Sequence, residues 1–575
     1  MATVPPATAP YDWILAITTI AFVFASASNG ANDVANSYAT SVAARTLTLW
    51  QAGILAAITE FIGAVALGAR VTDTIKNGII TIDRFEGRPA VLMLAMGCAE
   101  VGNATWLTVA TCLGMPVSTT QTIVGSLIGV GFASQSAITW GWEKGSVSQV
   151  AASWGIAPLI AAGFSAIIFG IVKYSVLERK NSFEWAMRLI PIYMASTGAI
   201  LVTFLGTEVP DSLIAEGWPL GVTVVATFFF VLFVAYVFFV PFFNRKLVKE
   251  DPRVRIWHVP MGPLLYRENV NLYWPGKTDE LVTNYYEDAY DAETASHQSH
   301  SDEEKANIKT GPKGTSTVDP SLADGSSSGV DAPANATRRV VPHHKKHPEP
   351  KERWLDPVKE LPFFHPKKIW NWTKFLLLQG VARDAVTHNS DALRAIHARA
   401  RKYDVRVEHL FTYCQVVSAM MMSIAHGSND VANAVGPWAA TYQTWQSGFV
   451  DTESSTPVWF LVVAGLLLGV GFWVYGYHII RALGNRITQM SPSRGFSIEL
   501  GAAITVLLAS SLALPVSTTQ CLVGASMGVA LMNYDVGAVN WKQLFYIFCG
   551  WVMTLPCAAL ISGLLCLMAL NAPHF

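Results

Sequence analysis

The chain has 575 residues, of which 51% are hydrophobic and 14% are charged, and its formal net charge at pH 7 is −1. Soluble globular proteins usually carry about 25% charged residues, so this deficit argues against a soluble chain. The nearly neutral balance also argues against nucleic acid as a partner, because binding to its phosphates needs an excess of Lys and Arg.

Long apolar runs account for the deficit and predict an all-α, polytopic membrane protein. A helix needs about 20 apolar residues to cross the hydrocarbon core of a bilayer, and the run at 218–243 has that length without a single charge. The runs that begin at Pro116 and Pro515 are shorter, so we expect re-entrant or half-length helices there. About twelve segments are predicted in chain order: 12–44 (broken), 48–70, 89–114, 115–133, 150–177, 186–206, 218–243, 408–440 (broken), 457–483, 496–514, 515–533 and 541–570.

Composition divides the chain into four parts. An uncharged, Pro-rich leader at 1–10 precedes a first transmembrane block at 11–243. A polar central loop at 244–405 separates it from a second transmembrane block at 406–575. The middle of this loop, 290–350, is rich in Ser, Gly, Pro, Lys, Asp and His. It predicts disorder, because it cannot bury enough apolar surface to offset the entropy of ordering.

The two ends of the central loop are less polar than its middle. Aromatic and Pro-containing fragments occur near 257–275, and the sequence FFHPKKIWNWTKFLLLQG occupies 363–380. Segments of this kind are typical of amphipathic pieces that lie on a membrane surface.

Two polar motifs occur once in each apolar block. NDVAN occupies 32–36 and 429–433, and PVSTTQ occupies 116–121 and 515–520. The same order and nearly the same spacing indicate duplicated halves. In transporters such halves often form inverted repeats, with the binding site at their interface near the bilayer midplane. Small residues alone would serve helix packing, so the polar residues favour a ligand over a packing motif.

The NDVAN motif predicts a cation site. Asp33 and Asn36 lie three residues apart, on one face of a helix, and an aspartate at membrane depth is costly unless it is paired or hydrated. The stretches around the repeated motifs contain no Lys or Arg: 12–44, 89–133, 413–480 and 496–533. The counter-charge should therefore be mobile, either Na⁺ on hard oxygen ligands or a proton on the aspartates. The residues predicted to bind it are Asn32, Asp33, Asn36, Asn429, Asp430 and Asn433.

The PVSTTQ motif predicts an anion site. Proline is favoured at the first position of a helix, so we expect Ser-Thr-Thr in the first turn, where free N–H groups and hydroxyls meet the positive end of the helix dipole. Gln121 and Gln520 offer an acceptor to a cation and a donor to the anion, and we count them with the cation ligands. Back-bonding to helix carbonyls is the simpler explanation for one such motif, but not for two. The predicted anion ligands are Ser118, Thr119, Thr120, Ser517, Thr518 and Thr519.

Electrostatics couples the two predicted sites. A divalent oxyanion and two aspartates repel each other strongly in a medium of low dielectric constant. Because no fixed Lys or Arg is available, anion binding requires cations to enter as well. Symport of a tetrahedral oxyanion with cations follows from these charges.

At these residues the chain resembles the inorganic phosphate transporter (PiT) family of cation–phosphate symporters. The resemblance covers both apolar blocks and rests on GANDVANS, GSNDVANAVGP and the paired PVSTT motifs. The stretch WQAGILAAITEFIGAVALGARVTDTIKNGI is similar to the fungal branch. The resemblance implies a twelve-segment inverted-repeat fold with a cytoplasmic central loop, phosphate held by both Ser-Thr-Thr turns, and Na⁺ near both NDVAN motifs. We expect a plasma-membrane symporter that imports phosphate, with Na⁺ as a co-transported ion, no cofactor and no enzymatic activity.

The chain departs from the family at one position in each half. Many members carry His after the Ser-Thr-Thr, where this chain has Gln121 and Gln520. Glutamine favours Na⁺ coupling over H⁺ coupling, although Asp33 and Asp430 can still titrate.

Three further carboxylates lie within the predicted segments and are candidates for coupling. Glu60 and Glu499 match positions at which the family is functionally sensitive, and Glu100 precedes Pro116 as Glu499 precedes Pro515, by 16 residues. Hydrogen bonding across helices explains such glutamates equally well.

Other functions remain open from the sequence. The transported anion could be sulfate, although aspartate oxygens can accept the proton of HPO₄²⁻, which sulfate lacks. A phosphate sensor with little transport would carry the same motifs. An enzyme with Ser118 or Ser517 as nucleophile is disfavoured, since His426 stands alone beside its aspartate. The expected partners are inorganic phosphate, Na⁺ or H⁺, and the lipid bilayer; a homodimer is left open.

Overall fold

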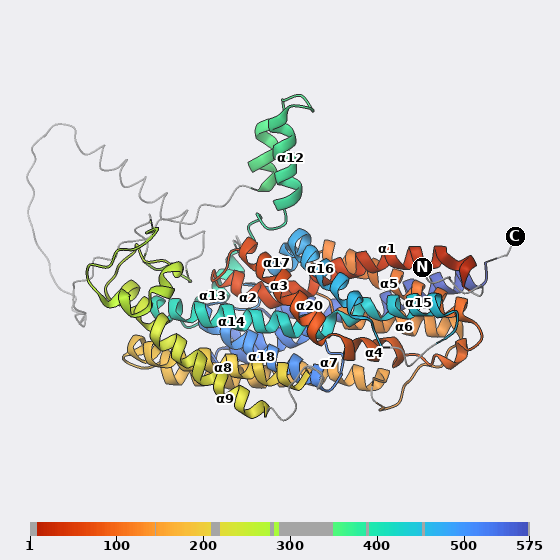
Figure 1. The fold of residues 1–575 in the computed structure, drawn as a ribbon, viewed down its shortest axis with the longest axis horizontal. Coiled ribbons are helices and arrows are strands. Elements are labelled where there is room, and N and C mark those ends of the chain that lie inside the picture. Colours follow the sequence, from red (N-terminus) through yellow and green to blue (C-terminus); the bar gives the residue numbers. More distant parts are fainter. Residues whose placement is uncertain are drawn as a thin grey trace, which may run out of the picture. The chain divides into compact units, whose positions relative to one another are not determined.

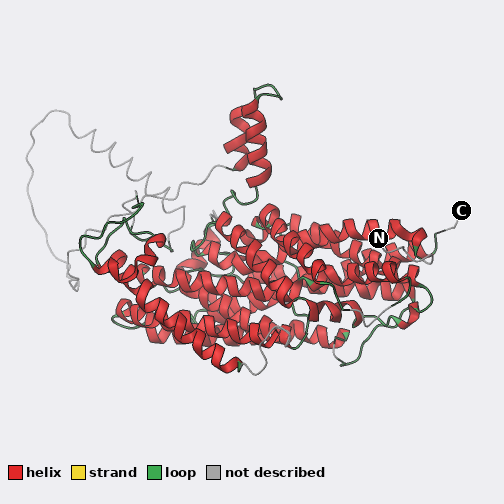
Figure 2. Ribbon diagram, in the orientation of Figure 1, coloured by secondary structure: helices red, strands yellow, loops and turns green. Residues whose placement is uncertain are grey.

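The computed structural model describes residues 8–143, 145–208, 219–276, 281–286, 349–386, 390–450 and 455–572. These residues form helices and connecting loops (Figure 2), and the one β-bridge among them joins Ile80 to Ile138. The middle of the central loop, for which the sequence predicts disorder, lies outside the described residues except for 349–350.

The first apolar block folds into helices separated by short loops (Figure 1). A Thr48–Gln51 capping box starts α3, and Gly68 separates α3 from α4. The helices are α1 (Asp12–Asn29), α2 (Ala35–Ala43), α3 (Leu49–Leu67), α4 (Ala69–Asn77), α5 (Pro89–Cys112), α6 (Thr119–Ser134), α7 (Val147–Val172), α8 (Ser182–Glu208), α9 (Leu220–Val234) and α10 (Val240–Phe243).

The second block repeats much of this order. Asp404 caps α14, and Ser517 caps α19. The described helices from residue 366 onward are α12 (Pro366–Leu378), α13 (Asp391–Arg399), α14 (Val405–Asp430), α15 (Ala432–Ser447), α16 (Val458–Tyr475), α17 (Tyr477–Leu483), α18 (Pro492–Ser511), α19 (Thr518–Leu531) and α20 (Trp541–Leu570).

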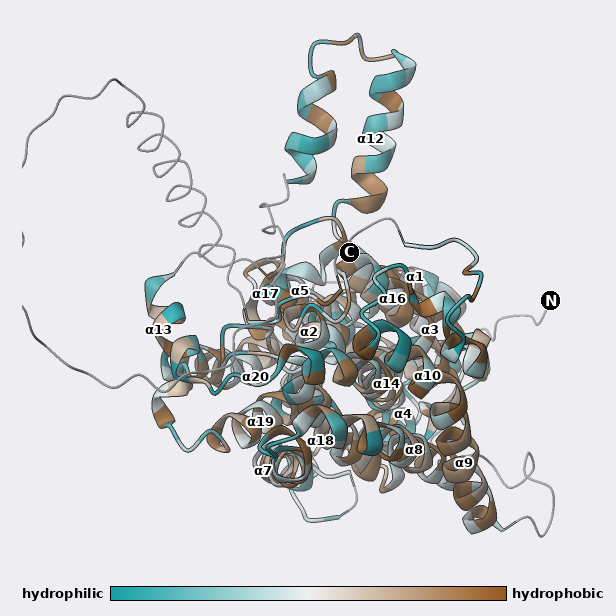
Figure 3. Ribbon diagram, turned by 90° about the vertical axis from the view of Figure 1, so that its left-hand side faces the viewer, coloured by the Kyte–Doolittle hydropathy of each residue, from teal (hydrophilic) through white to brown (hydrophobic). Residues whose placement is uncertain are grey.

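The helical segments confirm a polytopic membrane protein. Helix α9 shows why: it has no buried residue, and Figure 3 shows it as a hydrophobic ribbon at the edge of the bundle. Within the described residues, eight helical segments are long and apolar enough to cross a bilayer: Ala9–Ala43, Leu49–Leu67, Pro89–Cys112, Val147–Leu177, Ser182–Thr207, Leu220–Val248, Val458–Tyr475 and Trp541–Leu570.

The predicted spans at 408–440 and 496–514 are helical but are not among these eight. Helices α14 and α18 contain too many polar residues for their sequences to pass as lipid-exposed spans, and α15, with 16 residues, is too short. Every residue of 491–500 is buried, so α18 meets protein rather than lipid there. Helices enclosed by other helices need no apolar surface all round, which is why hydropathy alone misses them.

The two halves pack through matching helix pairs. Helix α1 contacts α5 as α14 contacts α18, and α6 contacts α20 as α19 contacts α7. Glycines allow the second pair to approach closely: a Cβ added at Gly129 of α6 would lie 2.1 Å from the carbonyl oxygen of Ala559. One added at Gly528 of α19 would lie 2.2 Å from that of Ala162. Small residues four apart are the usual means of such close packing in membranes, and Gly125 and Gly524 complete both pairs.

We predict that Gly129→Ala and Gly528→Ala each destabilise the protein, because the added methyl group overlaps a backbone carbonyl. Overpacking of this kind costs about 1–3 kcal/mol, and thermal unfolding in detergent should show a lower Tm for both variants. Gly163→Ala on α7 is the matched control, since nothing lies within 4 Å of its Cβ position. An equal loss at Gly163, or no loss at Gly129 and Gly528, would contradict the close-packing account.

Candidate functional site

Each PVSTTQ motif leads into a capped helix N-terminus. Helix α6 begins at Thr119, and Ser118 is its N-cap residue, with the hydroxyl accepting the N–H of Gln121 at 3.2 Å. Ser517 caps α19 in the same way, at 3.3 Å from the backbone nitrogen of Gln520. The sequence therefore places two helix N-termini where anion sites are predicted.

The expectation that proline occupies the first helical position is wrong. Pro116 precedes the first residue of α6, Thr119, by three positions, and Pro515 precedes α19 in the same way. Serine is among the preferred N-cap residues, because its side chain satisfies an N–H that has no partner within the helix. The serine, rather than the proline, marks where each helix starts.

The first asparagine of each NDVAN motif holds the loop that precedes the capped helix. Asn32 donates from Nδ2 to the carbonyl oxygen of Met115 at 3.1 Å, and its Oδ1 accepts the N–H of Val117 at 3.2 Å. Asn429 makes the two equivalent bonds to the loop before α19, each at 3.2 Å. Both side chains thus fix the position at which α6 and α19 begin.

The two aspartates lie at irregularities of their helices. Asp33 belongs to a π-helical segment, Gly30–Val34, between α1 and α2, and Asp430 ends α14. A Cβ added at Gly30 would lie 1.9 Å from the carbonyl oxygen of Leu468, so only glycine fits where this segment meets α16. Segments of π-helix inside α-helices are frequent at functional sites.

Threonines from both helix starts contact these buried aspartates. Thr119 Oγ1 donates to Asp33 Oδ2 at 2.6 Å, and Thr519 Oγ1 donates to Asp33 Oδ1, also at 2.6 Å. Thr518 Oγ1 donates to Asp430 Oδ2 at 2.8 Å, and Thr119 Oγ1 lies 3.5 Å from the same oxygen. The two aspartates and three threonines therefore form one cluster that neither half completes alone.

The last asparagine of each NDVAN motif also reaches into the opposite half. Asn36 Nδ2 donates to Thr519 Oγ1 at 2.7 Å. Asn433 Nδ2 lies 2.9 Å from Thr119 Oγ1 and 3.2 Å from Thr120 Oγ1. These contacts join the predicted cation ligands to the predicted anion ligands.

Several buried oxygens of the predicted cation ligands have no hydrogen-bond partner among the described residues. Leaving such an atom unpaired costs about 1–3 kcal/mol, and most buried polar atoms in proteins are paired. Carboxylate and amide oxygens are the hard ligands that bind Na⁺ and similar cations. The unpartnered atoms are Asn36 Oδ1, Asn433 Oδ1, Gln121 Oε1, Gln520 Oε1 and Asp430 Oδ1.

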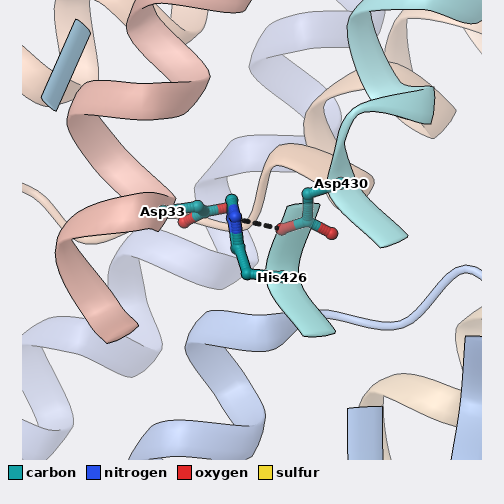
Figure 4. A group of neighbouring side chains, drawn as sticks. All are labelled: Asp33, His426 and Asp430. Atoms are coloured by element: carbon teal, nitrogen blue, oxygen red, sulfur yellow. Dashed lines mark ion pairs between the residues drawn. The ribbon is translucent and has the colours of Figure 1, made fainter. Parts of the chain in front are cut away.

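His426 lies close to both aspartates, and Figure 4 marks its ion pair with Asp430. Its Nε2 lies 3.0 Å from Asp430 Oδ2, and one ligand atom each of Asp33, His426 and Asp430 lie within 4.8 Å of one another. Its Nδ1 lies 2.7 Å from Glu60 Oε2. The interpretation of His426 as alone beside its aspartate is therefore wrong. Asp430 follows His426 by four residues on the same helix, so the sequence alone indicates that these two side chains are neighbours. Glu60 comes from α3, 366 residues away in the chain, and no local spacing indicates its contact with His426.

The three candidate coupling glutamates have different surroundings. Glu60 accepts a hydrogen bond from Ser423 at 2.6 Å and contacts His426. Neither carboxylate oxygen of Glu100 has a partner among the described residues. Glu499 accepts hydrogen bonds of 2.6 to 3.2 Å from four side chains: Thr40, Ser41, Gln415 and Ser418.

Known proteins resemble this chain over most of its length. A sequence model of the phosphate transporter family matches residues 29–562. The phosphate-repressible phosphate permease pho-4 of Neurospora crassa is 37% identical, over 98% of both chains. Sodium-dependent phosphate transporter 1 of Rattus norvegicus is 29% identical over 98% of this chain and 96% of its own. Sodium-dependent phosphate transporter 2 of Homo sapiens is 29% identical over 92% and 93%.

A solved structure shares the fold. It is described as the sodium-dependent phosphate transporter, and it aligns with a TM-score of 0.62 at 23% sequence identity. The alignment covers 98% of this chain and 100% of that one. The similarity therefore extends through both apolar blocks.

We predict that Asn32→Ala and Asn429→Ala each lower the Tm of the protein in detergent without added ligand. Each change removes the partners of a buried carbonyl and a buried N–H, at a cost of about 1–3 kcal/mol for each group left unpaired. Thr105→Ala is the control, since the hydroxyl of this exposed residue bonds only to the carbonyl of Val101 on its own helix. Unchanged Tm values in both asparagine variants would disprove the loop-fixing role.

Proposed function

Since the chain belongs to the phosphate transporter family, we propose that it imports inorganic phosphate across the plasma membrane by symport with Na⁺. The observation that carries the proposal is the cluster in which threonines of both capped helices meet Asp33 and Asp430, with several buried oxygens unpartnered. Its relatives act in phosphate transport, which is not an enzymatic activity.

In the proposed site, phosphate lies between the starts of α6 and α19. Each helix start offers the positive end of a dipole and first-turn N–H groups without helical partners. Of these, the Thr119 N–H now donates to Asp33 Oδ2 at 3.2 Å, and those of Gln121 and Gln520 donate to the capping serines. The threonine hydroxyls, which now donate to the aspartates, would turn to the phosphate oxygens. The proposed ligands are the Ser-Thr-Thr residues of both motifs: Ser118, Thr119, Thr120, Ser517, Thr518 and Thr519.

The proposed cations lie where amide and carboxylate oxygens are unpartnered. The ligands would be Asp33, Asn36 and Gln121 with Asp430, Asn433 and Gln520. Asn32 and Asn429 already use their Oδ1 atoms on backbone N–H groups, so the geometry favours a positioning role for them over the predicted ligation. Cation binding would neutralise the charge of the aspartates, which otherwise repel a divalent anion.

The proposed transport cycle uses two inverted repeats of about twelve segments in total. Supporting this, the helix pairs α1–α5 and α14–α18 match, as do α6–α20 and α19–α7. A site at the interface of such repeats suits alternating access, because the repeats can rock about a fixed ligand. Proton coupling is a second candidate, favoured by the chain of Glu60, His426 and Asp430 that leads to the cluster.

The first test is uptake of phosphate by purified protein in proteoliposomes. We expect uptake that depends on an inward Na⁺ gradient and that excess sulfate inhibits weakly, because sulfate offers no proton to Asp33 or Asp430. Uptake driven by a proton gradient with Na⁺ absent would select the proton-coupled alternative. Binding without uptake under either gradient would select a sensor, and equal competition by sulfate would contradict phosphate specificity.

The second test asks whether both halves hold one anion. Thr119→Val and Thr518→Val each remove one hydroxyl at nearly constant volume. A hydrogen bond to a charged group contributes about 1.5–3 kcal/mol, so each variant should bind phosphate about ten- to a hundredfold more weakly at saturating Na⁺. The double variant should deviate from additivity, because the residues share one ligand. Wild-type affinity in both folded variants would disprove the shared site.

The third test separates the cation site from the anion site. Asp33→Asn and Asp430→Asn keep the side-chain shape but remove a negative charge, so they should raise the Na⁺ concentration needed for half-maximal phosphate binding. Thr105→Ala, away from the cluster, should leave this concentration unchanged. If both aspartate variants retain the wild-type Na⁺ dependence, the cations bind elsewhere.

A further inference from the structure

One helix in the described part of the central loop carries an apolar face that no other described segment covers. The central hairpin, residues 349–380, consists of a π-helical turn at Lys351–Leu355, a 3₁₀ turn and α12 (Pro366–Leu378). Figures 1 and 3 show α12 projecting from the bundle. The tip of the hairpin and α12 expose eight large apolar side chains: Phe363, Phe364, Ile369, Trp370, Trp372, Leu376, Leu377 and Leu378.

Four of the exposed apolar residues of α12 form one stripe. Ile369, Trp370, Leu376 and Leu377 are spaced i, i+1, i+7 and i+8, which places them on one side of a helix. Each exposes at least half of its surface. Contiguous exposed apolar surface of this kind marks an interaction site rather than an ordinary solvated face.

The place where the hairpin is attached favours lipid as the partner that covers the apolar stripe of α12. Trp473, in the last turn of the membrane-spanning helix α16, donates from Nε1 to the carbonyl oxygen of Leu377 at 2.6 Å. The Trp473 ring also packs on α3, where a Cβ added at Gly53 would lie 2.7 Å from it. The stripe on α12 thus starts beside the outward-facing apolar row of α3, which includes the exposed residues Trp50, Ile54, Ile58 and Ile62.

The direction of α12 agrees with a position at a bilayer surface. In Figures 1 and 3, α12 crosses the direction of the spanning helices at a steep angle. A helix perpendicular to the spanning helices runs along the membrane plane. An amphipathic helix in that orientation buries its apolar face at the boundary between headgroups and acyl chains.

The charges of α12 select the kind of lipid. All of its charged residues are lysines: Lys367, Lys368 and Lys374. Lys367 and Lys374 are seven residues apart, so they lie along one edge of the apolar stripe, and Lys374 Nζ lies 5.2 Å from the centre of the Trp370 ring. Lysines beside interfacial aromatic residues attract anionic headgroups near the membrane surface.

We propose that the apolar stripe of α12 lies in the headgroup region of a leaflet that contains anionic phospholipid, and that Lys367 and Lys374 bind its headgroups. The hairpin thereby fixes the central loop to the membrane at the end of α16. This proposal rests on α12 and its attachment, and does not depend on which ion drives transport.

The test measures the depth of spin labels on the full-length protein in lipid nanodiscs, with and without phosphatidylserine. Labels are attached at Ile369→Cys and, as the matched control on the opposite face of α12, at Asn371→Cys. The exposed Cys112 and Cys549 and the half-buried Cys557 are first replaced by serine. With phosphatidylserine, the Ile369 label should be several-fold less accessible to a water-soluble nickel chelate than the Asn371 label, and more accessible to oxygen.

A second comparison tests the lysines. Lys367→Gln with Lys374→Gln should remove the effect of phosphatidylserine on the depth of the Ile369 label, while phosphate uptake by the folded protein persists. Equal nickel accessibility at both labelled positions would overturn the proposal and leave a protein partner as the occupant. Strong coupling between Ile369 labels of two chains would overturn it in favour of a second copy. Equal depth with and without phosphatidylserine would overturn the role of the anionic headgroups.

Discussion

The hydrogen bond from Thr519 to Asp33 is the contact on which the rest of the structure depends, because its two residues are 486 positions apart and belong to different halves. A buried carboxylate is stable only where donors are already in place. Three of the four donors to Asp33 come from Asn36 and Thr119 in its own half, and the fourth is Thr519 of the other half, so the starts of α6 and α19 must reach the same point. Close helix contacts at Gly129 and Gly528 and the bonds of Asn32 and Asn429 to their loops meet that requirement.

Among the described residues, no Lys or Arg side chain is bonded to this cluster, and this has a consequence for turnover. Hydrogen bonds to a charged donor are roughly twice as strong as those between neutral groups. An arginine would therefore hold a divalent anion tightly both when the site faces the outside and when it faces the inside. Hydroxyls and backbone N–H groups bind more weakly by themselves. In the proposed function, the cations supply the missing attraction on one side of the membrane and withdraw it on the other when they leave.

Much of this arrangement could be predicted from the sequence, and the failures have physical reasons. The apolar runs and repeated motifs predict a duplicated membrane protein, and the structure brings Asp33, Asp430 and the threonines into one cluster. The helix starts were misplaced, because proline and serine both favour the first turn and only the serine cap decides between them. The contact of Glu60 with His426 depends on how α3 packs against α14, which no local spacing reveals. Helix α18 is enclosed by other helices and needs no apolar surface all round, so its hydropathy falls below that of a lipid-exposed span.

The exchange of donors between halves also limits how such a protein could have arisen. A chain of half this length, with one NDVAN and one PVSTTQ, would have its aspartate facing an empty place where the threonine of the other half now lies. Two such chains packed against each other would be needed to complete the cluster. Fusion of the two copies would then have turned a concentration-dependent encounter into a permanent one, after which each copy was free to change by itself. His426, at the place where the first half has Asn29, is a difference of this kind.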